Sequence, residues 1–398
     1  MVVELKQLET LKFKTLVVTW SLPPGISGSS NIVSNLAKGF DADELVLVGE
    51  RWPGPETNRW DEEHGANPSI HFIHRQWPWK FQKTIRLFLF PLILWRLFRV
   101  YKQTKCQQVL AVFPNELYTF MALILARWHR VAFYSYFHNT YLDNRTGIKR
   151  IFAKWLQPRI FRHSHAVFVM SDGMKGVMDK RYPDVRFVTL VHSFHGRIPQ
   201  ATHRLIPDKT FKLAFMGNLN HSNRDAFGRI KYILDEFSEC QFTMYSGTPA
   251  SQFRNVGIEG PNIVHTRVGF DEVVDAMKRH DLLFLPHGFE GGINDIEYAT
   301  IFPTRTIPYL LAGVPILAHS PPNAFLTRWL QAHDCAEVVD TTDKDDLINA
   351  LTGLIRSPDR QRTIASNALD AARQFRISKV SSILKTTINQ TNQVTCVE

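Results

Sequence analysis

Short apolar runs recur along the first half of the chain, and helix-length segments separate most of them. The runs are KTLVVT (14–19), LVLVG (45–49), IHFIH (70–74), QVLAVF (108–113), VAFYSYF (131–137) and AVFVM (166–170). Segments such as SSNIVSNLAKGF and GIKRIFAKWLQPRIF have helical apolar spacing. Buried strands that alternate with helices are typical of a parallel sheet covered on both faces. The pattern predicts a Rossmann-like first domain.

The same rhythm restarts after GRIPQATHRLIPDKTF, whose Pro, His and charged residues break the periodicity and predict a linker near 196–210. We expect a helix over 224–237, and others at DEVVDAMKRH and KDDLINALTGLIR. The expected strands of this half are KLAFMGNL, QFTMYSG, NIVHTRVG, DLLFLPHG and GVPILAH. This half is predicted to be a second Rossmann-like domain.

The last periodic segment, RISKVSSILKTTINQT, is followed by no strand, so it must dock on a surface that already exists. We expect this helix to cross back to the first domain. The predicted division is an N-terminal domain over 1–200, a C-terminal domain over 205–375 and the returning helix over 376–398. No tandem repeat with a period of 20–50 residues is present.

Composition supports an ordered globular protein in a reducing compartment. The 398 residues are enough for two domains, and 44% are hydrophobic. The four cysteines form no Cys-x-x-Cys pair, so neither a zinc site nor a disulfide framework is indicated. They are Cys106, Cys240, Cys335 and Cys396. The start, MVVELKQLETLKFK, mixes acids and bases before any apolar run, unlike a secretory signal. We therefore expect a cytoplasmic protein.

Positive charge is concentrated in the first half of the chain. Residues 1–200 hold 27 Lys/Arg and 15 Asp/Glu, a balance of +12, which leaves 20 and 22, or −2, for the rest. No acidic residue lies between Glu63 and Glu116. The bases in that window are Arg75, Lys80, Lys83, Arg86, Arg96, Arg99, Lys102 and Lys105. The imbalance indicates an anionic partner.

The segment RQWPWKFQKTIRLFLFPLILWRLFRVYKQTK, 75–105, combines a nine-residue apolar centre, Leu87 to Trp95, with flanking Trp, Arg and Lys. Nine residues fall short of the roughly 20 needed to span a bilayer. The composition suits a helix lying in a membrane interface. A buried helix of the Rossmann-like domain, with its charged ends reaching solvent, explains it equally well. Nucleic acid is less attractive, because no motif for binding it accompanies the charge.

The stretch IFPTRTIPYLLAGVPIL, 301–317, places Arg305 at the start of a short apolar helix. Pro303 and Pro308 restrict where this helix begins, and Thr306 is the expected N-cap. Thr304 and Arg305 then lie at the positive end of the helix dipole, which favours an anion such as a diphosphate. In isolation, an Arg that pairs with a local carboxylate is the simpler interpretation.

Two further loops follow expected strands. In FMGNLNHSNRDAF, 215–227, Gly217 permits close backbone approach to a ligand and Arg224 opens the next helix. In LPHGFEGG, 285–292, a buried strand ends in a Gly-rich loop that bears Glu290, with Glu297 beyond it. Ordinary turns between strand and helix would explain either loop taken alone. Ligands of open α/β sheets bind at such strand ends.

These pieces, in this order, resemble the C-terminal domain of GT-B glycosyltransferases, particularly the retaining family 4. FMGNL resembles the family's phosphate loop, FDEVVDAMKRHDLLFLPHGFEGG its Glu-bearing loop, and FPTRTIPYLLAGVPIL its Phe-Pro-Ser/Thr-Lys segment. The resemblance covers 211–375 well and the N-terminal domain loosely. It implies an α/β protein with two Rossmann-like domains facing across a cleft. The N-terminal domain would take the acceptor and the C-terminal one the nucleotide-sugar donor.

The N-terminal domain has two features that match the family. SLPPGISGSSNIV resembles a loop, here containing Gly25, Ser27 and Gly28, that faces the donor diphosphate and sugar. His138 in SYFHNTY resembles a histidine near the donor sugar. A Gly-rich turn and a buried structural histidine are the alternatives.

The resemblance also assigns roles in the C-terminal domain. Arg224, Arg305 and Thr304 would stabilise the diphosphate, and Glu290 would bind sugar hydroxyls. The remaining residues implied at the donor site are Gly217, Asn218, His287, Gly291, Gly292, Glu297 and Tyr309.

The sequence departs from the family pattern at two positions. Pro308 stands where many relatives have the second Glu of a pair, which contacts the donor ribose, and Glu297 is a candidate replacement. Asn218 stands where an Arg is often found, so Arg224 and Arg305 would carry the diphosphate charge.

The sequence thus predicts a metal-independent, retaining transfer of a hexosyl group from a nucleotide-diphosphate sugar to a hydroxyl acceptor. No cofactor, metal or nucleic-acid partner is expected. A lipid-linked acceptor at the inner face of a membrane, as in glycolipid or polysaccharide synthesis, a soluble acceptor such as a sugar phosphate, and a degenerate sugar-nucleotide-binding protein all remain open. The identity of the base, the sugar and the acceptor is not predicted.

Overall fold

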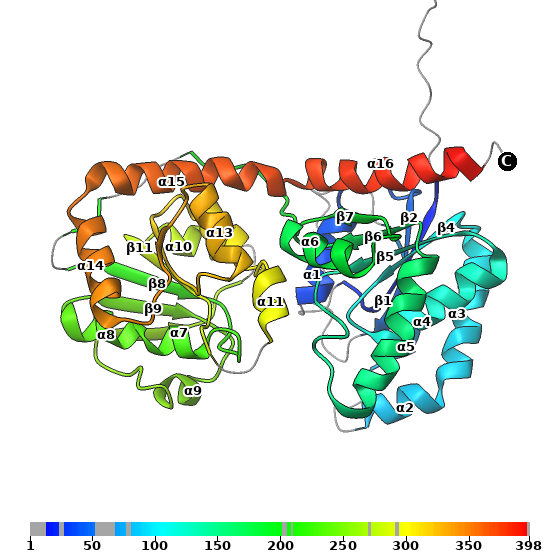
Figure 1. Cartoon of the computed structure of the whole chain (residues 1–398), viewed down its shortest axis with the longest axis horizontal. Helices are drawn as coiled ribbons and strands as arrows, with labels where there is room; N and C mark the ends of the chain where they lie inside the picture. The colour runs from blue at the N-terminus through cyan, green and yellow to red at the C-terminus, as the bar shows by residue number, and fades with distance from the viewer. Residues whose placement is uncertain are drawn as a thin grey trace, which may run out of the picture. The chain divides into compact units, whose positions relative to one another are not determined.

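Two parallel sheets organise the chain, one in each of two units (Figure 1). The computed structural model describes residues 13–23, 28–51, 68–76, 81–200, 205–207, 210–269, 272–290 and 294–395. Unit 1 comprises 1–195 and 377–398, and unit 2 comprises 196–376. We describe each unit by itself.

Unit 1 contains a seven-stranded parallel sheet with the order β3-β2-β1-β4-β5-β6-β7. Its strands are β1 (Thr15–Ser21), β2 (Leu45–Arg51), β3 (Ser69–Arg75), β4 (Gln108–Val112), β5 (Ala132–Phe137), β6 (Ala166–Val169) and β7 (Phe187–Thr189). The central strand β4 is buried at every position, as the apolar runs predicted. The edge strand β7 was not predicted, since its three residues are too few to show a period.

Helices cover this sheet. They are α1 (Gly28–Ala37), α2 (Gln82–Phe88), α3 (Phe90–Thr104), α4 (Glu116–His129), α5 (Gly147–His163), α6 (Asp172–Arg181) and the C-terminal α16 (Ile377–Thr395). The apolar centre, predicted to lie in one helix, is divided between two helices, because the chain breaks at Leu89 and Pro91 lies in the first turn of α3. In the described part of the chain, no helix has both the length and the apolar content needed to cross a bilayer.

The C-terminal helix α16 packs back onto unit 1, as predicted (Figure 1). Its Lys385 Nζ lies 2.8 Å from Glu44 Oε2, and the Tyr134 hydroxyl donates to the carbonyl of Ile388 at 3.1 Å. Val380 and Leu384 join the apolar core beside α1. The last helix therefore completes the core of the first unit.

Unit 2 contains a six-stranded parallel sheet with the order β10-β9-β8-β11-β12-β13. The strands are β8 (Lys212–Met216), β9 (Gln241–Tyr245), β10 (Ile263–Thr266), β11 (Leu282–Pro286), β12 (Ile316–His319) and β13 (Glu337–Val339). The helices are α7 (Arg224–Gly228), α8 (Ile230–Glu236), α9 (Ala250–Arg254), α10 (Val273–Met277), α11 (Asp295–Thr300), α12 (Thr306–Ala312), α13 (Phe325–Ala332), α14 (Lys344–Ile355) and α15 (Pro358–Ala372). The helix predicted over 224–237 is two helices that break at Arg229.

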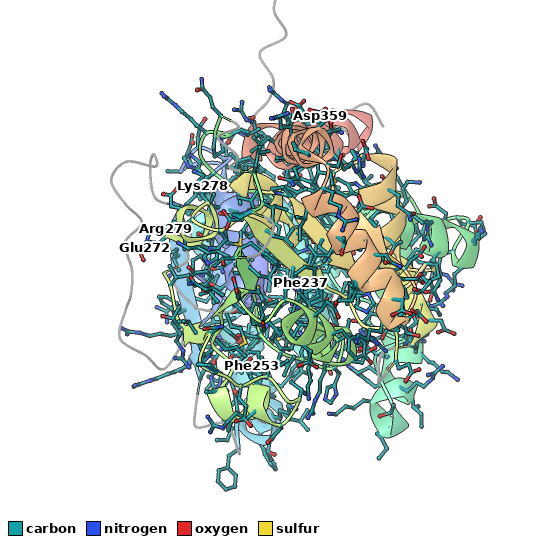
Figure 2. The ribbon with its side chains drawn as sticks, turned by 90° about the vertical axis from the view of Figure 1, so that its left-hand side faces the viewer. Phe237, Phe253, Glu272, Lys278, Arg279 and Asp359 are labelled. Carbon is teal, nitrogen blue, oxygen red and sulfur yellow. The ribbon has the colours of Figure 1, made fainter. Side chains whose placement is uncertain are left out.

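The core of unit 2 continues under its short helices. Figure 2 views this unit from its side, with Phe253 of α9 and Phe237, which follows α8, labelled. Phe253 is fully buried in the core, and Phe237 packs against it. The short helices α8 and α9 are therefore held by burial, since segments of five to seven residues are too short to be stable alone.

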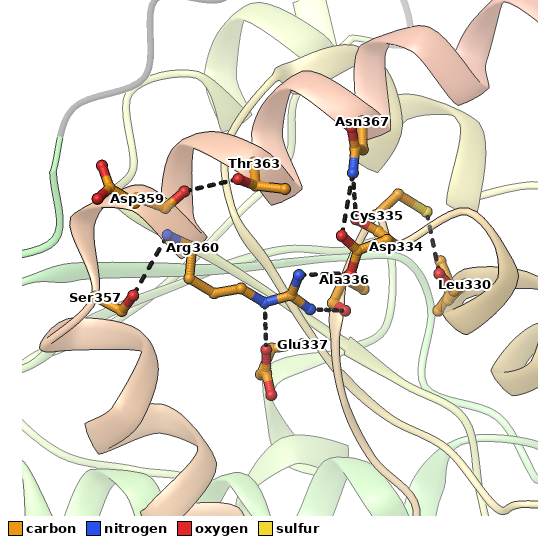
Figure 3. Close-up of polar contacts among 10 residues, drawn as sticks. All are labelled: Leu330, Asp334, Cys335, Ala336, Glu337, Ser357, Asp359, Arg360, Thr363 and Asn367. Carbon is orange, nitrogen blue, oxygen red and sulfur yellow. Dashed lines mark hydrogen bonds and ion pairs between the residues drawn. The ribbon is translucent and has the colours of Figure 1, made fainter.

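The long helix α15 is fixed to the edge of the sheet by Arg360 (Figure 3). Its guanidinium pairs with Asp334 and donates to Glu337 at 3.0 Å. Asn367, two turns further along, donates to the Asp334 carbonyl at 3.0 Å. This network lies at the β13 edge and stabilises the scaffold.

Candidate functional site

The guanidinium of Arg305 lies over Gly217 in unit 2. Gly217 follows β8 and has φ +133°, a backbone conformation that residues other than glycine rarely adopt. A Cβ at this position would lie 3.0 Å from Nη1 of Arg305, so the contact depends on glycine. Among the described residues, no carboxylate pairs with Arg305. Burial lowers the pKa of Arg305, but an arginine remains charged at neutral pH.

Tyr309 of α12 anchors the helix that follows Arg305. Its side chain is fully buried, and its hydroxyl donates to the Phe284 carbonyl at 2.8 Å and accepts from the Met216 N–H at 2.9 Å. The hydroxyl thus joins α12 to β8 and β11. Tyr309 therefore fixes the helix that begins next to Arg305, and its predicted contact with the donor stays a prediction.

The start of α12 differs from the prediction. Arg305 occupies the N-cap position and Thr306 is the first helical residue, so the prediction of Thr306 as N-cap was wrong. The Pro303 carbonyl accepts from the Thr306 N–H at 2.9 Å, which closes the turn one residue earlier than expected. Thr304 is exposed beside Arg305.

Arg224 and Glu290 line one hollow of about 350 Å³ in unit 2. Both side chains are exposed, and Arg224 opens α7 while Glu290 follows β11. Residues lining it with them include His221, Asp225 and Val256. The structure therefore brings Arg224, predicted to bind the diphosphate, and Glu290, predicted to bind the sugar, to the same hollow.

Asp225 holds the Glu290 loop. Its carboxylate accepts hydrogen bonds from the N–H groups of Phe289 at 2.8 Å and Glu290 at 3.0 Å, while Arg229 lies 3.3 Å away. The Gly288 N–H donates to the Ser222 carbonyl at 2.6 Å. A Cβ on Gly288 would overlap the Asp225 carboxylate. The loop after β11 is therefore fastened to the loop after β8.

His287 lies near both Arg305 and Asp225. Its side chain is fully buried, and neither ring nitrogen has a hydrogen-bond partner among the described residues. Burial and the neighbouring Arg305 lower the pKa of His287 to about 3, against an opposing effect of Asp225. The Tyr298 ring packs 5.4 Å away between centroids. The imidazole is therefore neutral at physiological pH.

Two other predicted donor residues differ in their contacts, since Asn218 bonds through its side chain and Glu297 through its backbone. The Asn218 Oδ1 accepts from the Gly247 N–H at 3.0 Å, so this amide joins the loops after β8 and β9. Glu297 lies in the first turn of α11, and its N–H donates to the Asn294 side chain at 2.9 Å. Its charge helps to raise the pKa of Tyr298 to about 12, after burial, Asp225 and Asp295. Gly291 and Gly292 lie outside the described residues.

Unit 1 carries a second group of polar residues at the carboxyl edge of its own sheet. His138 follows β5 directly, and its Nε2 lies 3.2 Å from the Ser29 hydroxyl at the start of α1. Burial, with a smaller effect of His192, lowers the pKa of His138 to about 3. Burial also lowers the pKa of His192 to about 4. Of the loop predicted to face the donor, Gly28 begins α1, while Gly25 and Ser27 lie outside the described residues.

Sequence reasoning did not identify Asp225, Ser29 or His192. Asp225 directly follows Arg224, but nothing in the local pattern signals its bonds to residues 64 and 65 positions away. Ser29 and His138 are separated by 109 positions. His192 lies in VHSFH just before the linker, where neither a strand nor a helix was predicted. These residues could not be identified from the sequence, because each contacts residues that are far away along the chain.

No group of three or more His, Cys, Asp or Glu side chains within the described ranges is arranged to hold a metal ion. Cys106, Cys240 and Cys335 are buried free thiols, and Cys396 lies outside those ranges. Burial raises the pKa of Cys240 and Cys335 to about 12. These thiols are therefore poor candidates for nucleophiles.

Comparison with known proteins shows the fold of the chain and the family that it resembles. Residues 26–189, fewer than half of the chain, match the model of Glycosyltransferase Family 4. No curated protein matches the sequence significantly. Sucrose-phosphate synthase from Thermosynechococcus elongatus superposes with a TM-score of 0.70 at 11% identity, covering 96% of this chain and 99% of its own.

Two other solved structures have similar folds. Anabaena HepE, solved in complex with UDP and glucose, superposes with a TM-score of 0.68 at 14% identity, covering 95% of this chain and 100% of its own. The lipopolysaccharide outer core galactosyltransferase WaaB gives a TM-score of 0.61 at 14% identity, with coverage of 95% and 100%. The chain has the GT-B fold, and its predicted resemblance to glycosyltransferase family 4 is confirmed.

Proposed function

We propose that the protein transfers a hexosyl group from a uridine-diphosphate sugar to a hydroxyl acceptor, with retention of anomeric configuration. The observation that carries the proposal is the arrangement of Arg305 over Gly217, with no described carboxylate to neutralise it. The choice of donor is supported by Anabaena HepE, which was solved with UDP and glucose. Retention is what the family resemblance implies.

The chemical work of this site would be to stabilise the leaving group. As the bond between sugar and diphosphate breaks, negative charge grows on the diphosphate, and cations already in place lower the barrier. Arg305 and Arg224 are proposed to supply this charge, with Thr304 as a hydrogen-bond donor. The contact between Tyr309 and the two strands keeps Arg305 in position, so little reorganisation is needed during reaction.

Glu290 is proposed to accept hydrogen bonds from donor sugar hydroxyls. Its backbone is held by Asp225, which leaves its exposed side chain free to reach into the hollow that it shares with Arg224. His287, neutral and without a described partner, is a further donor ligand candidate. Glu297 is proposed to bind the donor ribose, since Pro308 has no side-chain group that could accept a hydrogen bond from it.

The carboxyl edge of the sheet in unit 1 is proposed to bind the uncharged hydroxyl groups of the reactants. His138 is buried and neutral at physiological pH, so it can exchange hydrogen bonds with hydroxyl groups without attracting a phosphate. Gly25, Ser27 and Gly28 are proposed to approach the donor in the way the family resemblance implies.

A thermal-shift screen of nucleotide-diphosphate sugars, followed by turnover, tests this function. Arg305→Ala should reduce donor affinity roughly tenfold to a hundredfold, because the substitution removes a charge-assisted hydrogen bond to the diphosphate. Arg362→Ala is the matched control, since Arg362 in the same unit forms only a surface pair with Asp359. Unchanged donor kinetics in folded Arg305→Ala would refute the assignment.

Glu290→Gln separates the sugar contact from the nucleotide contact. It should lower turnover more than affinity for bare UDP. If affinity for UDP falls as much as turnover does, Glu290 contacts the base or the ribose and not the sugar. A protein that binds donors but transfers no sugar to any hydroxyl acceptor would instead be a degenerate binding protein.

A lipid-linked acceptor at an anionic membrane surface is the acceptor class we favour. The exposed positions of α3 carry Leu92, Trp95 and several bases and no acid. Replacing Arg96, Arg99, Lys102 and Lys105 with Gln should release the protein from anionic vesicles, because each such base contributes about 1 kcal/mol that salt screens. Turnover of a water-soluble acceptor analogue should stay nearly intact.

A different result with these four substitutions would favour the alternative acceptor. If the folded variant loses activity on a soluble acceptor, the basic surface belongs to the acceptor site, as expected for a sugar phosphate. If the unmodified protein does not bind anionic vesicles at low salt, a soluble acceptor is favoured over a lipid-linked one.

A further inference from the structure

Helix α5 presents an apolar and basic surface that the charge pattern of 75–105 did not include. Its first turns expose Ile148 at 85%, Ile151 at 69% and Trp155 at 41% of their surface. These positions follow the three- and four-residue spacing of one helix face. The exposed bases of the helix are Lys149, Arg150, Lys154, Arg159 and Arg162. No acidic residue is present in α5.

Helix α3 repeats the same arrangement. Leu92 and Trp95 are 40% and 57% exposed, and the Arg99 guanidinium lies 5.9 Å from the centre of a Trp95 ring. In α5, the Arg159 guanidinium lies 4.4 Å from a Trp155 ring. Each helix therefore carries exposed apolar residues that end in a tryptophan, with an arginine stacked on that tryptophan one turn later.

The two surfaces are linked through the helix between them. Helix α3 follows α2 in the connection from β3 to β4, and α5 connects β5 to β6. Helix α4 lies between them and contacts both (Figure 1). Aromatic contacts join the three helices, with ring centroids 6.1 Å apart for Phe90 and Phe120 and 5.7 Å apart for Phe120 and Trp155.

Charge in this part of the chain is almost entirely positive. Between Glu63 and Asp172 the sequence has 16 Lys/Arg and only two acids, Glu116 and Asp143. Both acids are paired, Glu116 with Arg145 at 3.5 Å and Asp143 with Arg181 at 2.9 Å. Within the part of the chain that the structure describes, no ion pair neutralises the bases of α3 and α5, which leaves their charge for an external anion.

We propose that α3 and α5 together form a bilayer-docking surface, in which Ile148, Ile151 and Trp155 enter the interface of an anionic membrane beside Leu92 and Trp95. The proposal deepens and rests on the membrane part of the proposed function. Stable attachment to a membrane takes both apolar burial and electrostatic attraction, and the two helices supply both. Tryptophan and arginine are suited to headgroup depth.

A bilayer explains this surface better than a second copy of the chain does. Two copies meeting through these helices would bring like charges together, which opposes association. The apolar side chains are spaced singly along the helices and protrude by up to 85% of their surface, with bases between them. A fluid, anionic interface accommodates such a surface without a complementary shape.

The test is flotation of the full chain with vesicles of equimolar phosphatidylglycerol and phosphatidylcholine, compared with phosphatidylcholine alone. The variant Ile148→Ser with Ile151→Ser removes apolar area and keeps every charge. Its partition into anionic vesicles should fall about tenfold or more. The matched control is Leu205→Ser with Val264→Ser, two exposed apolar residues of unit 2 at 43% and 53%, which should bind like the unmodified protein.

A second variant keeps the test independent of folding defects. Replacing Lys149, Arg150 and Lys154 with Gln leaves the apolar residues in place and should weaken flotation most at low salt. If both variants retain the thermal stability and the vesicle binding of the unmodified protein, α5 has no docking role, although release by the α3 substitutions would still support attachment through α3 alone.

Failure of the membrane idea and failure of the transferase idea give different results. Loss of flotation with unchanged transfer to a soluble acceptor supports the docking surface. Absence of flotation in the unmodified protein overturns it, whether or not sugar is transferred. A dimer in analytical ultracentrifugation that the Ile148→Ser, Ile151→Ser variant dissociates, with no vesicle binding, would assign the surface to a second copy instead.

Discussion

Two buried histidines occupy equivalent places in the two units and have different surroundings. His138 directly follows β5 in unit 1, and His287 directly follows β11 in unit 2. Burial is the main reason that the pKa of each falls to about 3. His138 lies against the Ser29 hydroxyl, 3.2 Å away, with His192 nearby. His287 lies near Arg305 and Asp225, whose charges act on its pKa in opposite directions.

The difference shows how one architecture supports two kinds of contact. In a parallel sheet the carboxyl ends of all strands lie at one edge, whichever residues occupy those ends. In unit 2 this edge gathers Arg305, Arg224, Asp225 and Glu290, which suits a charged diphosphate and its sugar. In unit 1 the described groups around His138 are uncharged, which suits hydroxyl groups.

The largest effect is expected from Gly288→Ala, which disturbs only the charged edge. The new Cβ would overlap the Asp225 carboxylate and lie 3.0 Å from the Ser222 carbonyl, so the loop bearing Glu290 must shift. We expect kcat to fall roughly tenfold to a hundredfold, as overpacking by 1–3 kcal/mol would produce. Initial rates with a UDP-sugar measure this.

The control for this substitution is Gly353→Ala. Gly353 lies in α14 of the same unit, where an added Cβ would meet nothing within 4 Å. Activity of this control should equal that of the unmodified protein. Equal activity of Gly288→Ala would show that the position of the Glu290 loop does not matter for turnover.

A smaller effect is expected on acid stability, and it should be common to both units. His138 and His287 have folded pKa values of about 3, below the 6.5 of an unfolded histidine. Above pH 6.5 both states are neutral, and as pH falls the unfolded state binds protons that the folded state excludes. Each histidine should therefore lower the free energy of unfolding by about 2 kcal/mol between pH 7.5 and pH 5.

Urea unfolding at the two pH values measures this loss. In His287→Gln or His138→Gln the difference between the two pH values should shrink by about the amount for one histidine. An unchanged pH dependence in His287→Gln alone would mean that the nearby charges keep the pKa of His287 closer to its ordinary value, and would separate the two edges.

The smallest effect is expected from chelation. If Arg305 and Arg224 supply the positive charge for the leaving diphosphate, activity should persist unchanged in excess EDTA. Initial rates before and after chelation, with Mg²⁺ or Mn²⁺ added back, measure this. Activity that is lost and then restored by either ion would show that the charges at the edge of unit 2 are insufficient by themselves.

Much of the architecture could be predicted because it depends on local patterns. Buried strands such as β4 and β11 are continuous apolar runs, and both were expected at their observed places. The breaks at Leu89 and Arg229 were missed, since the apolar spacing continues across them. Arg305 was identified from its place before an apolar helix, yet its contact with Gly217 could not be read from either segment.

The two α/β units, the returning helix and the positions of the polar strand ends follow from local sequence patterns, because hydrophobic periodicity and turn residues act over a few positions. The three-dimensional arrangement of the elements was needed to show that Asp225 holds the Glu290 loop, that Ser29 contacts His138 and that α5 lies near α3. Those contacts join residues about 60 to 110 positions apart, as in the pairs Asp225 with Glu290 and Ser29 with His138. Such long-range contacts are set by the order of the strands in the sheet and by the direction of the connections between them. Neither can be read from the contacting residues alone.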